Sequence, residues 1–257
     1  MKRRIFLLPI LMMLSCATVL AHESITHHDN SSSIQQKVKT VTIMGLGDSI
    51  TQGGNYFTSY LYPLWKLLTK AGYDFQFVGS NSSQYDIGTL RHCGYSGQTA
   101  EYLASKISDW YRQYPADIVL LHSGHNHFID EDPIASIIDS YKAIIDTIQS
   151  INPKARILAA SIINSGKLPK YSYIPDLNKR IQDLVKEYND KHIIFVDISK
   201  NFDWSTCTVN DMVHPNAYGA QIMADAWFKA LRRLKMPRVP SSSSKNKESS
   251  IPFHPTS

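Results

Sequence analysis

The stretch VTIMGLGDSITQG at residues 41–53 decides the fold class. Its first four residues form a continuous β-branched and apolar run, which is typical of a strand buried on both faces of a parallel sheet. Glycines then flank Asp48 and Ser49 and permit a tight turn. A serine in this position is well placed as an exposed nucleophile, but taken alone it is explained better by an ordinary strand-to-helix turn.

Similar apolar runs recur along the chain, and helical patterns separate them. The further candidate strands cover residues 75–78, 117–121, 156–163 and 193–198. The candidate helices cover residues 59–71, 99–111, 132–151, 176–188 and 216–234. This alternation predicts an α/β protein, a three-layer α/β/α sandwich with a five-stranded parallel sheet. Ligands of such sheets bind beyond the carboxyl ends of the strands, so a site is expected just after each strand.

The two ends of the chain differ from this folded unit. Residues 1–21 join a basic Lys2-Arg3-Arg4 start to an apolar run and small residues, which indicates a signal peptide. Residues 22–38 are polar, and we expect them to form a flexible lead-in. We expect the Ser/Pro-rich residues 237–257 to form a disordered tail. The predicted domain is therefore residues 39–236.

This leader predicts a secreted or periplasmic protein. Two alternatives are an uncleaved anchor and a lipoprotein attached through Cys16, because residues 13–16 loosely resemble a lipobox. No other apolar run approaches spanning length, so no stable membrane span is expected after leader removal.

Charge and composition exclude several classes of protein. The sequence has 27 Lys and Arg against 22 Asp and Glu, and without the three basic leader residues the balance is 24 against 22. We therefore expect no nucleic-acid partner. Three cysteines are too few for a disulfide-built mini-protein, and 43% apolar residues exclude wholesale disorder.

Three later segments carry polar groups beside predicted elements. The glycines of residues 91–99, RHCGYSGQT, free backbone N–H groups that can face an anion. Asn126, just after the third strand, offers an amide donor at the same sheet edge. Asp211 and His214 stand three residues apart and can hydrogen-bond, which would fix the histidine tautomer for a nucleophile.

These segments together resemble the four blocks of the SGNH, or GDSL-type, hydrolase superfamily. The blocks are Gly47-Asp48-Ser49, a glycine in residues 91–99, Gly124-x-Asn126 and Asp211-x-x-His214. The motifs at residues 43–51, 71–80 and 92–97 are similar to those of the acetylxylan-esterase-type carbohydrate esterases. The resemblance spans about residues 41–234 and implies a flavodoxin-like SGNH hydrolase fold.

The resemblance also implies a role for each matching residue. Ser49 would be the nucleophile, His214 the general base and Asp211 the residue that orients His214. The oxyanion hole would consist of the Ser49 N–H, the Gly97 N–H and the Asn126 amide, with Gly94 as the alternative to Gly97. Asp48 would brace the turn, and no cofactor or metal would be required.

The resemblance predicts an exported serine esterase that removes small acyl groups, acetyl above all, from carbohydrate. Its partner would be an acylated carbohydrate or another small ester, and the sequence assigns no oligomeric state. One alternative is a lysophospholipase or thioesterase with the same triad. Another is a weakly active, carbohydrate-binding SGNH domain, because His127 stands where the family's third block has Asp. A metal site at His122, His125 and His127 is a further, less favoured interpretation, since loop packing also explains their spacing.

The two cysteines outside the leader are Cys93 and Cys207. If the catalytic assignment is right, their loops meet at one rim of the sheet. An exported protein enters an oxidising compartment, where thiols tend to pair, so one interpretation is a disulfide between Cys93 and Cys207 that links the two loops. The alternative is two separate thiols.

Overall fold

Seven strands form one sheet in the computed structural model, which describes residues 39–239. They are β1 (Val41–Gly47), β2 (Phe75–Phe77), β3 (Asn81–Tyr85), β4 (Gly88–Gly94), β5 (Ile118–His122), β6 (Arg156–Ala160) and β7 (Ile193–Val196). The order is β3-β4-β1-β5-β6-β7, and β2 pairs with the first half of β1. Every pairing is parallel except that of β3 with β4. The carboxyl ends of β1, β4 and β5 thus share one edge.

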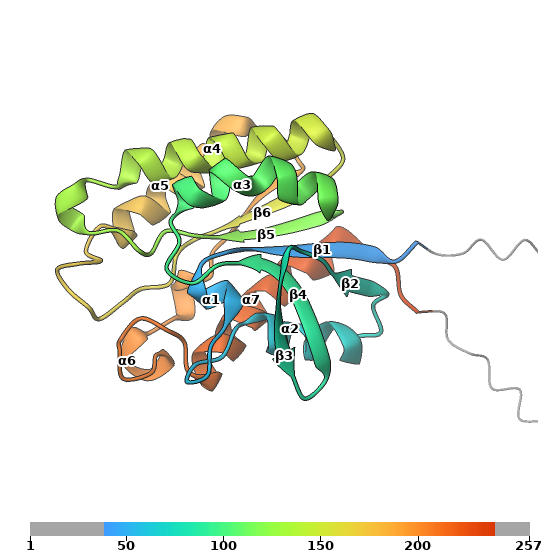
Figure 1. The fold of residues 1–257 in the computed structure, drawn as a ribbon, viewed down its shortest axis with the longest axis horizontal. Helices are drawn as coiled ribbons and strands as arrows, with labels where there is room; N and C mark the ends of the chain where they lie inside the picture. The colour runs from blue at the N-terminus through green and yellow to red at the C-terminus, as the bar shows by residue number, and fades with distance from the viewer. Residues whose placement is uncertain (1–38, 240–257) are drawn as a thin grey trace, which may run out of the picture. The chain divides into compact units, whose positions relative to one another are not determined.

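Helices cover both faces of this sheet (Figure 1). One face packs against α3 (Ala100–Gln113), α4 (Ile134–Ile151) and α5 (Ile174–Tyr188), and the other against α2 (Leu61–Lys70) and α7 (Ala217–Leu231). Alternate residues of β1 serve the two layers, with Met44 and Leu46 on the α3 side and Ile43 on the α2 side. Both faces are apolar, which is why the strands read as continuous runs in the sequence. The predicted three-layer class is confirmed.

The predicted number of strands was wrong, because the hairpin of β3 and β4 was missed. The β3 sequence is NSSQY, and its residues alternate between partly buried and exposed. A half-exposed antiparallel strand lacks the buried apolar run that identified the other strands. This hairpin places Gly94 and the loop after it beside the end of β1, where Gly94 pairs with Gly47.

Of the two alternatives for Cys93 and Cys207, the structure shows two separate thiols and not the disulfide. Both cysteines are buried and unpaired. Cys93 lies in register with Leu46 and packs in the α3 layer, whereas Cys207 packs with α7 on the other face. Their loops do approach one rim, but the sheet lies between the two thiols.

The described chain continues slightly beyond the expected domain limit at residue 236. The Asp74 N–H donates to the Pro237 carbonyl at 3.0 Å, and the Val239 N–H donates to Gly72 at 2.9 Å. The expected leader, lead-in and remainder of the tail lie outside the described residues. Within residues 39–239, no helix has the length and apolar character needed to cross a membrane.

Candidate active site

The turn after β1 presents Ser49 at the sheet edge. Gly47 has no room for a Cβ, because the His122 carbonyl and the Thr51 side chain occupy that space. Asp48 then caps the short helix α1 (Ser49–Gln52), its carboxylate accepting from the Ile50 N–H at 2.9 Å. The cap fixes Ser49 as the first helical residue.

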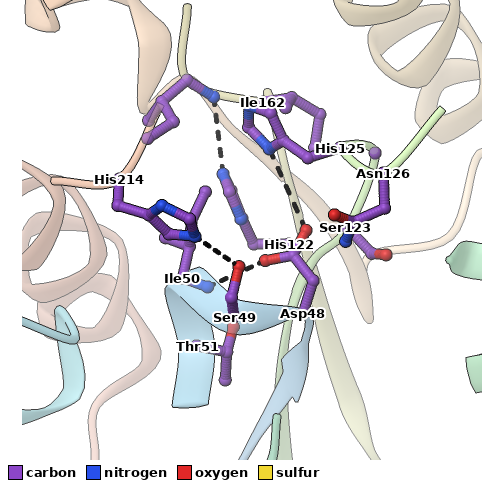
Figure 2. Close-up of polar contacts among 12 residues, drawn as sticks. Asp48, Ser49, Ile50, Thr51, His122, Ser123, His125, Asn126, Ile162 and His214 are labelled. Atoms are coloured by element: carbon purple, nitrogen blue, oxygen red, sulfur yellow. Dashed lines mark hydrogen bonds and ion pairs between the residues drawn. The ribbon is translucent and has the colours of Figure 1, made fainter. Parts of the chain in front are cut away.

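The loop before α7 brings His214 to this serine. The Oγ of Ser49 lies 2.8 Å from Nε2 of His214, although the two residues are 165 positions apart in sequence. Nδ1 of His214 lies 2.6 Å from Oδ2 of Asp211. A carboxylate only accepts, so Nδ1 carries the proton and Nε2 is left to accept from the serine hydroxyl (Figure 2).

The backbone of the same loop holds Asp211 in place. Its Oδ1 accepts from the N–H groups of Val213 and His214, both at 2.9 Å, around Met212 with a φ of 61°. Burial alone would raise the pKa of Asp211, but the hydrogen bonds from the side chain and backbone of His214 and from Val213 lower it. The carboxylate therefore stays ionised beside the imidazole.

Two further predicted residues lie across the nucleophile turn. Asn126, with a φ of 69°, follows β5, and its Nδ2 donates to the Gln98 carbonyl at 2.9 Å. This hydrogen bond ties Asn126 to Gln98. The preceding residue in the chain is Gly97, whose φ is 75°. Within residues 39–239, no group accepts a hydrogen bond from the backbone N–H of Gly97.

Gly94 plays a different part from Gly97. Its N–H already donates to Nδ1 of His92 at 3.0 Å, and a Cβ here would stand 2.5 Å from the Gln52 nitrogen. Gly94 is thus required for close approach of α1, and its N–H is committed. The geometry favours Gly97 over Gly94 as an anion donor.

The comparisons with known proteins identify the family. The family model for GDSL-like lipase/acylhydrolases matches residues 46–222, which include all four blocks. The chain belongs to this family. The protein is accordingly a carboxylic ester hydrolase, and the family predicted from the motifs is confirmed. No curated protein sequence matches the chain.

Three solved carbohydrate or acetyl esterases resemble this GDSL-like hydrolase with a TM-score of 0.66 each, over 76% of the chain. A family 3 carbohydrate esterase from Clostridium thermocellum is 30% identical and is covered over 99% of its length. The family 3 enzyme from Talaromyces cellulolyticus is 27% identical, with 98% covered. An acetyl esterase mutant solved with an acetate ion is 26% identical, also with 98% covered.

The family's third block departs from its usual pattern at His127, and the structure shows what replaces the carboxylate. Nε2 of His127 lies 3.1 Å from Glu101 of α3, and Nδ1 lies 3.0 Å from Glu131. Two carboxylates from neighbouring elements therefore hold the residue that follows Asn126. His127 is turned toward them, and within residues 39–239 no group of three or more His, Cys, Asp or Glu side chains has a geometry that could hold a metal ion.

A buried polar group lies directly beneath the nucleophile turn. Asp48 is fully buried, and burial raises its pKa to about 6 against the opposing effects of the Ile50 hydrogen bond and His214. His125 lies 3.9 Å from Asp48, but burial lowers the pKa of His125 well below its usual value. Figure 2 marks this contact with a dashed line. Because the lowered pKa leaves the imidazole neutral, the contact carries no ion-pair attraction.

Two residues that support the site were missed in the sequence. The Phe57 ring stacks on His214, with centroids 4.1 Å apart and planes at 27°. The Gln52 side chain accepts from the Ser96 N–H at 2.7 Å and joins α1 to the loop of Gly97. Neither stands in a motif, and only their nearness to Ser49 in sequence pointed to them.

Proposed function

We propose that this hydrolase is an exported serine esterase that removes acetyl groups from carbohydrate through Ser49, His214 and Asp211. The observation that carries the proposal is the continuous hydrogen-bonded chain from the Ser49 hydroxyl through His214 to Asp211. The same constellation of nucleophile, base and orienting acid serves acyl transfer on several unrelated folds.

The reaction follows from this geometry in two steps. Ser49 Oγ attacks the ester carbonyl and passes its proton to Nε2 of His214. The negative oxygen then receives hydrogen bonds from the Ser49 N–H, the Gly97 N–H and the Asn126 amide. His214 returns the proton to the departing sugar oxygen as the ester C–O bond breaks, leaving an acetyl-serine. Water, deprotonated by His214, releases acetate and restores Ser49.

The substrate class is supported by the relatives. Two are named carbohydrate esterases of family 3, and a third is an acetyl esterase solved with acetate. Export is proposed from the leader-like residues 1–21 alone. It is tested by finding the protein, shortened by its leader, outside the cytoplasm of the producing cell.

The experiment that tests the activity is acetate release by the purified protein from a panel of acetylated polysaccharides. We expect release from at least one polymer and none from the Ser49→Ala variant. A p-nitrophenyl ester series should favour the acetate. Preference for long acyl chains would instead support the lysophospholipase or thioesterase alternative, and failure of a fluorophosphonate to label Ser49 would support the non-catalytic one.

A further inference from the structure

A groove of about 480 Å³ has in its lining two aromatic residues that also contact His214. These residues are Tyr56 and Phe57. Phe57 stacks on it, and the Tyr56 ring meets it edge-on with centroids 6.1 Å apart. The groove is therefore separated from His214 by the Tyr56 and Phe57 rings, on the side of the loop that follows α1.

The lining of this groove is aromatic and amide-rich. Tyr62 and Tyr85 form one wall, with their rings stacked 4.8 Å apart and nearly parallel at 5°. Asn55 and Gln84 add side-chain amides. Tyr56 is 66% exposed as a residue, so much of its surface is available to a bound molecule.

The lining of the groove indicates which part of an ester substrate it suits, an acyl chain or a sugar. An alkyl chain gains most from enclosed aliphatic side chains, and here Val209 and Ala217 are the aliphatic residues in the lining. A sugar ring has apolar C–H faces that lie against aromatic rings and hydroxyls that pair with amides. The groove volume also falls in the range of a small-molecule site and far exceeds an acetyl group.

We propose that this groove, defined by loop 54–58, Tyr62 and Tyr85, binds the carbohydrate that carries the ester, with Tyr56 as the stacking platform. The inference rests on the proposed function and adds the residue that determines specificity for the sugar. Ser49 and His214 handle the acyl carbon, and the sugar lies in the groove.

The platform is fixed relative to the catalytic histidine. The Thr58 N–H donates to the carbonyl of Pro215, next to His214, at 3.3 Å, and the Gly54 N–H donates to Phe57 at 3.3 Å. Gly53 takes a φ of 83° to turn the chain out of α1 into this loop. A sugar stacked on Tyr56 is consequently held in register with the reacting atoms, so the contact should act on kcat/KM.

The test compares two substrates, an acetylated xylo-oligosaccharide and methyl acetate, which has no sugar. For Tyr56→Ala we expect the ratio of the two kcat/KM values to fall about tenfold, the worth of one aromatic stacking contact. Tyr56→Phe keeps the ring and should keep the ratio. Tyr218→Ala is the matched control, because Tyr218 is similarly exposed at 62% but does not line the groove.

The outcomes separate this inference from the proposed function. If the unmodified protein releases no acetate from any sugar ester, the proposed function fails. If it does release acetate but Tyr56→Ala lowers both substrates equally, the groove assignment is overturned and the function stands. A third outcome is that Tyr56→Ala lowers kcat/KM for simple esters by a factor that increases with the length of the acyl chain. That result would assign the groove to an alkyl chain and would also overturn the inference.

Discussion

Replacing Asp48 with Asn tests whether the turn beneath the nucleophile carries a buried, uncompensated charge. The carboxyl group is completely buried, and only its Oδ1 is hydrogen-bonded, to the Ile50 N–H. Within residues 39–239, Oδ2 has no hydrogen-bond partner, and the neighbouring His125 is neutral. Ionising this group in the folded state should therefore cost stability.

The size of that cost follows from the pKa. Burial raises the pKa of Asp48 from 3.8 to about 6, so the folded protein binds the proton more tightly than the unfolded chain. Below about pH 4 the carboxyl group is protonated in both the folded and the unfolded state, and it costs the folded state nothing. As the pH rises through about 6, the unfolded chain ionises more readily than the folded protein, and the free energy of unfolding falls. Two pKa units correspond to about 3 kcal/mol, which is the expected cost at neutral pH. Asn keeps the shape and the capping oxygen and carries no charge.

The assay is urea unfolding of both proteins at about pH 4 and about pH 8. Between the two, the free energy of unfolding of Asp48→Asn should rise by about 2 to 3 kcal/mol relative to the unmodified protein. The two proteins share every other titrating group, so the difference isolates Asp48. Asp211→Asn is the control: the pKa of Asp211 is lowered, so its contribution to stability is lost only below about pH 4, and its difference from the unmodified protein should change little between the two assay pH values. A difference at Asp48 that does not change with pH would refute the buried-charge argument.

The remaining predictions concern turnover. Ser49→Ala and His214→Ala should each lower the rate of acetate release at least about 10⁴-fold, and the double variant should lose little more. Substantial turnover by either single variant would show that the replaced residue is not part of the triad. Asn126→Gly removes the amide while suiting the φ of 69°, and kcat should fall about 10²- to 10³-fold with an unchanged circular dichroism spectrum. An unchanged kcat would exclude the amide from the oxyanion hole. His127→Ala removes the contacts with Glu101 and Glu131 that hold the chain next to Asn126, so kcat should fall by up to about 10²-fold. His127→Gln should restore part of the loss. Equal kcat in His127→Ala and the unmodified protein would show that Asn126 needs no such support.

The architecture was predictable where a strand is buried on both faces. Residues 41–44, 117–121 and 193–196 stand out as apolar runs because helices cover the sheet on both sides. The β3 sequence NSSQY gave no such signal, since it is a half-exposed edge strand held by its hairpin to β4. Its place in the sheet comes from pairing with distant residues, which a local pattern does not contain.

The meeting of Ser49 and His214 was predictable because parallel strands send their following loops to one edge. The same reasoning failed for Cys93 and Cys207. A loop's arrival at the rim does not determine the face on which a given side chain lies, and the two thiols point into opposite layers. Register decides this for Cys93, which pairs with Leu46 and shares its face.

At His127, the position that departs from the family motif has two partners of the opposite kind. A carboxylate after Asn126 would accept hydrogen bonds, whereas the imidazole here contacts two carboxylates, Glu101 from α3 and Glu131 from the short helix Ile129–Glu131. We therefore expect the position of Asn126 to depend on the presence of an imidazole–carboxylate pair and not on which member stands in the motif. The effect of having His127 in place of the family's Asp therefore has to be judged together with its partners, Glu101 and Glu131. Those partners lie 26 residues before and four residues after His127, where only the fold brings them to the loop.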